Sequence, residues 1–252
     1  MNSSETVLSE RDGPVAIVRL NRPGKHNAMN RELSGALAEM IARLEADDGV
    51  LAIVLTGAGE KAFCAGADMS EGGEPAAGAR RTSSGVLDGV AAVANATKPV
   101  IGALNGYTYG GGALLAVSTD IRLASPNCTW RFVGASYGLV VGGRLLAEIV
   151  GPAHAKELLF RANVIDAAEA ERIGLVNRVV PAGELVSAAV EIGKQIAANS
   201  PDAVRWAKRV VNAATDPDKA REAEDESNRV LRGTPDQVAR FKAAAQRVTG
   251  GR

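Results

Sequence analysis

The sequence has few of the features that mark several large classes of protein. Its 252 residues include only two cysteines, Cys64 and Cys128, which are too few for a disulfide framework and too far apart to suggest a metal site. Lys plus Arg and Asp plus Glu each number 29, so the formal charge is zero. No basic stripe indicates binding to nucleic acid or to a membrane surface. We therefore expect buried free thiols, no resident cofactor or metal, and a few placed groups to hold any anionic ligand.

Long apolar runs are also missing. No window approaches the ~18 continuous apolar residues of a membrane-spanning helix. The first residues, MNSSETVLSERDG, lack the basic segment and apolar core of a signal peptide. We expect a cytoplasmic protein without membrane contact. With 46% apolar residues, the chain can bury a sizeable core as one large domain, or as one domain with a helical appendage.

Strands and helices are predicted to alternate in the first half of the chain, and helices to dominate the second. The β-branched run Val15–Leu20 predicts a strand, and the continuous apolar run Val50–Leu55 predicts one buried on both faces. Asn30 can cap a helix between them. Further strands are expected at Pro99–Asn105 and Ile121–Ala124. After Gly143 we expect helices at 144–149, 154–161, 167–173, 185–198, 202–213, 218–232 and 235–247.

The stretch before the expected helix Val86–Asn95 is rich in Ser, Gly and Ala. Residues Met69–Gly85 show no clear period and predict a loop that can act as a lid. The sequence contains no internal repeat. We expect a core over residues 1–195 and a C-terminal helical region over residues 196–252.

Two turns rich in small residues carry the strongest functional signal. The first is Phe63–Asp68, FCAGAD, whose small side chains let a ligand approach the backbone. The second is Asn105–Gly112, where a buried strand runs into a helix whose first N–H groups are free to bind an anion. A Gly triplet alone more often marks a tight turn, but one amide from each turn can together hold one oxyanion.

In this order, the motifs resemble the crotonase (enoyl-CoA hydratase/isomerase) superfamily, and the resemblance covers most of the chain. It implies an α/β fold, a ClpP/crotonase-like spiral of β-β-α units, with C-terminal helices that mediate a homotrimer, often paired as a dimer of trimers. The matching stretches are Asn21–Pro23, Asn27–Ala28, Phe63–Asp68, Lys98–Ile101, Asn105–Gly106, Gly110–Gly112, Asp120–Ile121, Gly174–Asn177 and Val179–Pro181.

The resemblance also implies a ligand and the groups that hold it. The ligand is an acyl-coenzyme A, and its thioester oxygen accepts hydrogen bonds from the amides of Ala67 and Gly111. Such donors stabilise negative charge that develops on the oxygen during reaction, each by typically ~3 kcal/mol. The neighbouring residues expected at the ligand are Ala65, Gly66, Asp68 and Gly110.

The sequence departs from the family pattern at the catalytic carboxylates. Hydratases of the family use two glutamates to activate water and to deliver a proton. The first position holds Leu114, and a gapless alignment places the second at Gly134; residues 121–147 contain no Asp or Glu. Two functions stay open: an enzyme with an unusual acid or base, and a protein that binds or carries acyl-CoA without turnover. A hydrolase built on Ser136 is disfavoured because no histidine lies near it in sequence.

Two candidates for a substitute acid or base stay open. Tyr137 lies near the second vacated position, although a phenol with a pKa near ~10 is a weak base; the alternative is Glu71 or Glu74 of the expected lid, which closure could bring towards the ligand. Tyr107 is interpreted as a half-buried packing residue with its hydroxyl at the edge. His26, in a polar loop, is interpreted as a surface residue. Cys64, with no positioned base, is interpreted as a small packing residue rather than a nucleophile.

The rest of the ligand also has expected contacts. Arg22 and Lys25 fit the loop that, by resemblance, walls the coenzyme, with an exposed charged loop as the alternative. Phe241 and Lys242 loosely match the place from which family members reach a neighbouring subunit's nucleotide. Trp130 and Phe132, together with Leu114, are expected to make the acyl pocket more apolar than that of a hydratase.

Overall fold

The computed structural model describes residues 6–68, 87–137 and 142–214, with the separate positions 216, 222, 226, 229–230, 234–236 and 238–239. Backbone contacts divide the chain into two units, Met1–Lys194 and Gln195–Arg252. The lid expected at 69–85 lies outside the described residues, as do Phe241, Lys242 and most of the helices expected after residue 217.

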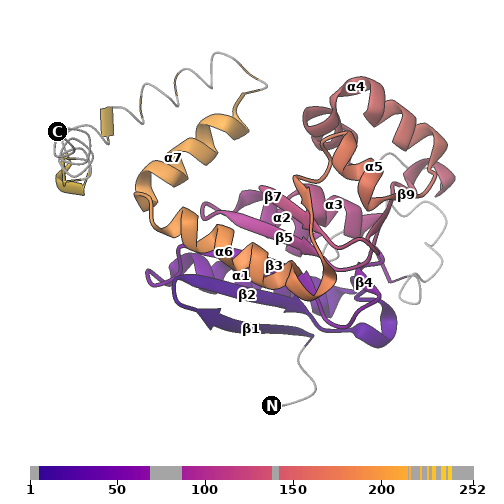
Figure 1. Cartoon of the computed structure of the whole chain (residues 1–252), viewed down its shortest axis with the longest axis horizontal. Coiled ribbons are helices and arrows are strands. Elements are labelled where there is room, and N and C mark those ends of the chain that lie inside the picture. Colours follow the sequence, from indigo (N-terminus) through magenta and orange to yellow (C-terminus); the bar gives the residue numbers. More distant parts are fainter. Residues whose placement is uncertain are drawn as a thin grey trace, which may run out of the picture. The chain divides into compact units, whose positions relative to one another are not determined.

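The first unit is built on a six-stranded sheet with the order β1-β2-β3-β5-β7-β10 (Figure 1). β1 and β2 form an antiparallel hairpin, and every other pair in this sheet is parallel. All residues of β3 and β5 are buried, as continuous apolar runs predict. The strands are β1 Val7–Asp12, β2 Val15–Leu20, β3 Ala52–Gly57, β5 Val100–Leu104, β7 Ile121–Ala124 and β10 Arg178–Val179.

A second sheet of four short strands has the order β4-β6-β8-β9. Its strands are β4 Ala62–Cys64, β6 Tyr107–Tyr109, β8 Thr129–Arg131 and β9 Ile165–Asp166. No sequence pattern predicted this sheet, because two or three residues are too few to show the alternation of a strand. The predicted extents of the two turns were therefore too long. Phe63 and Cys64 belong to β4, and β6 lies between Asn105 and Gly110.

The helices begin and end close to where their capping residues predict. The Asn30 side chain accepts a hydrogen bond of 2.9 Å from the Leu33 amide and so caps α1. α4 contains a break at Gly151, whose φ of 75° is not helical, so the two helices expected there are joined into one kinked element. The helices are α1 Arg31–Ala46, α2 Asp88–Asn95, α3 Gly111–Val117, α4 Gly143–Arg161, α5 Ala167–Arg172, α6 Leu185–Ala197 and α7 Pro201–Asn212.

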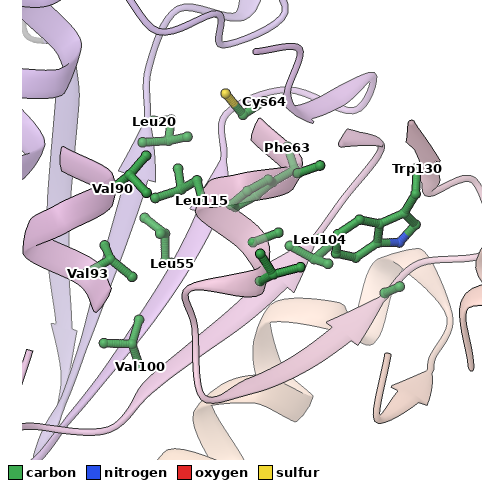
Figure 2. Close-up of a cluster of buried hydrophobic side chains, with 14 of the residues drawn as sticks. Leu20, Leu55, Phe63, Cys64, Val90, Val93, Val100, Leu104, Leu115 and Trp130 are labelled. Carbon is green, nitrogen blue, oxygen red and sulfur yellow. The ribbon is translucent and has the colours of Figure 1, made fainter. Parts of the chain in front are cut away.

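The core of the first unit lies between the strands and α1, α2 and α3. Figure 2 shows Phe63 from β4, Leu104 from β5 and Leu115 from α3 within one cluster of buried side chains. None of these three side chains is exposed to solvent. Within the described part of the chain, no helix is both long and apolar enough to cross a membrane.

A buried lysine joins α1 to β5. Lys98 is 1% exposed, and its ammonium group donates to the carbonyl oxygens of Leu44 and Asp47, at 2.7 and 2.8 Å. These carbonyls lie at the C-terminal end of α1, where the helix itself supplies no donor. Glu45, in the same turn, accepts from the backbone amides of Thr97 and Lys98. The Lys98–Ile101 motif therefore begins with a residue that caps a helix.

Candidate functional site

The two turns meet where β4 ends and α3 begins. Gly66 is so close to the second turn that a Cβ atom built on it would stand 2.8 Å from the Tyr109 carbonyl oxygen and 3.2 Å from the Gly111 amide nitrogen. A Cβ atom built on Gly111 would in turn stand 3.5 Å from the Ala67 amide nitrogen. The fold therefore brings the Ala67 and Gly111 amides, 44 positions apart in the numbering, to one place.

The hydrogen bonds around these two amides set them apart from their neighbours. Within the described part of the chain, neither the Ala67 nor the Gly111 N–H donates a hydrogen bond to the protein. Gly111 is the first residue of α3, a position whose N–H has no partner inside the helix. The preceding amide, Gly110, is used by the fold, because it donates to the Arg131 carbonyl at 2.9 Å. Two neighbouring amides without acceptors can bind one oxygen atom that carries negative charge.

Glycine is required at two positions for this approach. Gly66 has a φ of +101°, a conformation that side chains rarely adopt. Gly112 packs so closely on β4 that a Cβ atom there would overlap the Cys64 carbonyl oxygen. The small residues of both turns therefore let the two segments approach each other, in addition to leaving room for a ligand.

The loop after β2 holds the first turn in place. The Asn27 side chain accepts from the Arg22 amide at 3.0 Å and donates to the carbonyl oxygens of Ala58 and Ala62. The Arg22 guanidinium donates to the Ala28 carbonyl at 2.6 Å and pairs with Asp68 at 2.9 Å. The Arg22 and Asp68 side chains are only 18% and 7% exposed, so this ion pair is largely shielded from solvent.

Asparagines hold the second turn in the same way. The Asn105 side chain accepts from the Gly57 amide at 3.1 Å and donates to the carbonyl oxygens of Gly57 and Gly59. Asn127 then donates to the Asn105 carbonyl at 3.2 Å. The asparagines of the Asn27–Ala28 and Asn105–Gly106 motifs thus bond the loops that support the two turns.

The two positions expected to align with the family's glutamates, Leu114 and Gly134, carry no charged group. Leu114 is half-buried on α3 and packs against the core; a Cβ atom on Gly142 would stand 3.3 Å from its Cδ1. Gly134 is buried at the start of the 3₁₀ helix Gly134–Tyr137. Trp130, expected at the acyl pocket, is fully buried in the core, where its ring stacks on Phe132 with centroids 6.2 Å apart.

The aromatic and basic candidates lie nearer the surface. Tyr137 is 58% exposed at the end of its 3₁₀ helix. Tyr107 is 41% exposed, and its ring stacks on Tyr109 and meets His26 edge to face, with centroids 5.4 and 5.9 Å apart. His26 is exposed, as predicted, and so is Lys25 in the 3₁₀ helix Pro23–Lys25.

The two cysteines are buried, as predicted. Burial raises the pKa of the Cys64 thiol, from an ordinary value of 9.0, to about 12. The same cause raises the pKa of Cys128 to about 12. Cys64 therefore stays protonated near neutral pH and is not a nucleophile, although it lies beside the first turn.

One residue at the site was missed by sequence reasoning. Met29 lies between the two turns, paired with Ala67 in an isolated parallel β-bridge. An apolar residue just before a helix cap normally indicates core packing, so nothing in the sequence marks Met29 as part of the site. The predicted residues that the fold brings together at the two turns are Ala65, Gly66, Ala67, Asp68, Gly110 and Gly111.

Comparison with known proteins identifies the family of the chain. Residues 10–246 match the profile described as Enoyl-CoA hydratase/isomerase. The chain is 42% identical over 217 residues to the Short-chain-enoyl-CoA hydratase of Clostridium acetobutylicum, covering 82% of this chain and 80% of the relative. It is 34% identical over 239 residues to the Crotonyl-CoA hydratase of Syntrophomonas wolfei, covering 92% of each. The crystal structure of the Bacillus anthracis enoyl-CoA hydratase superposes with a TM-score of 0.88 at 29% identity, covering 96% of each chain.

Proposed function

We propose, given that the chain belongs to the enoyl-CoA hydratase/isomerase (crotonase) family, that it binds an acyl-CoA with the thioester carbonyl oxygen between the Ala67 and Gly111 amides. The observation that carries this proposal is the pair of adjacent N–H groups that have no acceptor within the described part of the chain. Such preorganised donors favour an oxygen whose negative charge increases, as it does when a thioester becomes an enolate. The names of the relatives, which act on enoyl-CoA or crotonyl-CoA, support this ligand class.

The coenzyme part of the ligand needs a cation that is not already committed. Lys25 is exposed on the loop beside the first turn, and we assign it to the coenzyme phosphates. The Arg22 guanidinium is already bonded to Asp68 and to the Ala28 carbonyl. Its contribution to binding is therefore to fix the first turn.

Ordinary hydration of an enoyl-CoA is not the reaction that we expect. Addition of water needs a base for the water and an acid for the α-carbon, and Leu114 and Gly134 supply neither. The half-buried Leu114 instead favours an apolar acyl group beside the hole. A second candidate function follows from the same observation, namely that the protein binds or carries acyl-CoA without turnover.

The test combines turnover and binding. Purified protein is incubated with crotonyl-CoA, and loss of the conjugated thioester absorbance is followed beside a family hydratase as positive control. Binding of butyryl-CoA and of free coenzyme A is measured by calorimetry. We expect tighter binding of butyryl-CoA than of coenzyme A, with little loss of crotonyl-CoA. Turnover equal to that of the control hydratase would refute the expected lack of hydration, and equal binding of both ligands would refute the hole.

Two variants at Gly111 isolate its N–H group. A proline at the first position of a helix breaks no hydrogen bond inside the helix, so Gly111→Pro removes the donor and leaves the hydrogen bonds of α3 intact. The Cβ atom that it adds would stand 2.9 Å from the Met29 Cε atom. Gly111→Ala adds a comparable Cβ atom and keeps the N–H, which makes it the matched control. We expect the proline variant to lose the preference for butyryl-CoA over coenzyme A, and the alanine variant to keep more of it.

The oligomeric state expected from the family is a trimer, or a dimer of trimers, built through the C-terminal region. α7 has no fully buried residue, and its Val211 side chain is 70% exposed. The other large apolar residues of α7, Val204, Trp206 and Val210, are also left partly exposed. A helix whose large apolar residues all remain accessible is suited to an interface between copies. Light scattering of the full chain tests this proposal, and a monomer would contradict it.

A further inference from the structure

We propose that Met29 is a positioning residue that joins the two halves of the oxyanion hole, a role that rests on the function proposed above. Met29 is 1% exposed and precedes Asn30, the cap of α1. Its main chain is bonded to the first turn, and its side chain reaches the second. Its proposed role is to hold the two donors in place, which makes it a positioning residue and not a catalytic one.

The main chain of Met29 sets the direction of the Ala67 amide. Its N–H donates to the Gly66 carbonyl at 2.7 Å, and its carbonyl accepts from the Asp68 amide at 2.8 Å. A trans peptide is planar, and its C=O and N–H point in opposite directions. Because the Gly66 carbonyl points to Met29, the N–H of the same peptide, which belongs to Ala67, points away from Met29. A reversed peptide would put the carbonyl oxygen in place of the donor and would repel a thioester oxygen.

The side chain of Met29 reaches the second donor. Its Cε atom lies 2.9 Å from the place where a Cβ atom on Gly111 would stand. The end of the thioether therefore occupies the space beside Gly111 that a side chain would fill, at the start of α3. One buried residue thus contacts both peptides that supply the donors, and the Arg22–Asp68 ion pair closes the same loop on its other side.

The experiment measures polarisation of a bound thioester. The ligand is hexadienoyl-CoA, whose absorption moves to longer wavelength when hydrogen bonds draw charge onto the carbonyl oxygen. The variants are Met29→Ala, which removes the side chain that reaches Gly111, and Met29→Leu, which keeps an apolar side chain of similar volume. Met40→Ala is the matched control, because Met40 is a second methionine of the same core, 6% exposed in α1. Thermal stability is measured for all variants.

We expect wild type and Met40→Ala to show the same red shift, Met29→Ala a clearly smaller one, and Met29→Leu an intermediate one. Both Met29 variants keep the main-chain bonds to the first turn and change only the contact with Gly111, and Met29→Ala should bind hexadienoyl-CoA about tenfold more weakly. Free coenzyme A should bind equally to all. If Met29→Ala loses stability as Met40→Ala does but keeps the full red shift, the proposal is wrong and Met29 is only a core residue. If Met29→Ala does not fold, a full red shift in Met29→Leu would likewise overturn the proposal. If wild type shows no red shift, the oxyanion hole itself fails, and this proposal fails with it.

Discussion

At the scale of single residues, the proposed site depends on backbone atoms. The two donors are main-chain amides, so the residues around them matter through the conformations and the close contacts that they allow. Gly66 can adopt a positive φ beside the Tyr109 carbonyl, and Gly112 can lie against the Cys64 carbonyl. This part of the site could be predicted because clustered small residues are a readable sequence signal. Met29 could not, since its contribution depends on a contact that has no sequence pattern.

We predict that Gly66→Ala destroys the proposed site. Alanine at a φ of +101° is strained, and its Cβ atom would stand 2.8 Å from the Tyr109 carbonyl oxygen. Strain of this kind costs about 1–3 kcal/mol of unfolding free energy. Chemical denaturation should show this loss, and calorimetry should show no preference for butyryl-CoA over coenzyme A. The control is Gly35→Ala within α1, where a Cβ atom meets nothing within 4 Å. Because alanine has a greater helix propensity than glycine, Gly35→Ala should raise the unfolding free energy by about 0.5–1 kcal/mol. An equal decrease of the unfolding free energy in both variants would contradict the strain assigned to Gly66.

We predict that neither thiol reacts in the folded protein at mildly alkaline pH. Burial raises the pKa of both Cys64 and Cys128 to about 12, and only the thiolate attacks a disulfide reagent. At about pH 8, near the ordinary cysteine pKa, native protein should release almost no chromophore from an aromatic disulfide, and denatured protein should release two equivalents. Rapid reaction of one thiol in native protein would show that a cysteine is accessible and ionised.

At the scale of elements, long apolar segments could be predicted and short strands could not. The bounds expected for Val15–Leu20 and Ile121–Ala124 agree with β2 and β7, because both runs are apolar and clearly bounded. Val50–Leu55 is shifted by two residues from β3, since a run that is buried on both faces has no periodicity to mark its ends. β4, β6, β8 and β9 have two or three residues each, and their pairing depends on segments distant in sequence.

We predict that Glu45 adds stability that is lost in acid. Burial raises the pKa of Glu45. Hydrogen bonds from the Thr97 side chain and from the Lys98 and Thr97 amides together lower it by more, so the net pKa lies below 4.5. As pH falls through 4.5, the unfolded chain takes up this proton before the folded protein does, so folding stability decreases until the folded carboxylate is also protonated. Glu45→Gln lacks this proton uptake.

The measurement is urea unfolding of wild type and Glu45→Gln from neutral pH down to pH about 3, below the ordinary glutamate pKa. Wild type should be more stable at neutral pH, and the difference should shrink as pH falls. Glu39→Gln, an exposed position in the same helix, is the control and should follow wild type. A difference between wild type and Glu45→Gln that is constant with pH would contradict the role assigned to this carboxylate.

At the scale of the whole molecule, the fold belongs to the family. Ordered motifs along the chain predicted the crotonase fold, and the profile match over residues 10–246 and the superposition on an enoyl-CoA hydratase confirm it. The reaction could not be predicted in the same way. Leu114 and Gly134, the positions expected to align with the family's carboxylates, carry no charge, and Tyr137 is 58% exposed at the end of its 3₁₀ helix. A fold that hosts many reactions leaves the reaction to its site.

The central claim is that the Ala67 and Gly111 amides hold a thioester oxygen. The most direct test is the infrared carbonyl stretch of butyryl-CoA labelled with ¹³C at the thioester carbon, recorded free and bound to the full chain. Two amide donors draw charge onto the oxygen and weaken the C=O bond, so the account predicts a bound band at lower frequency, which Gly111→Pro moves back towards the free value. A bound band at the frequency of the free ligand would contradict the account.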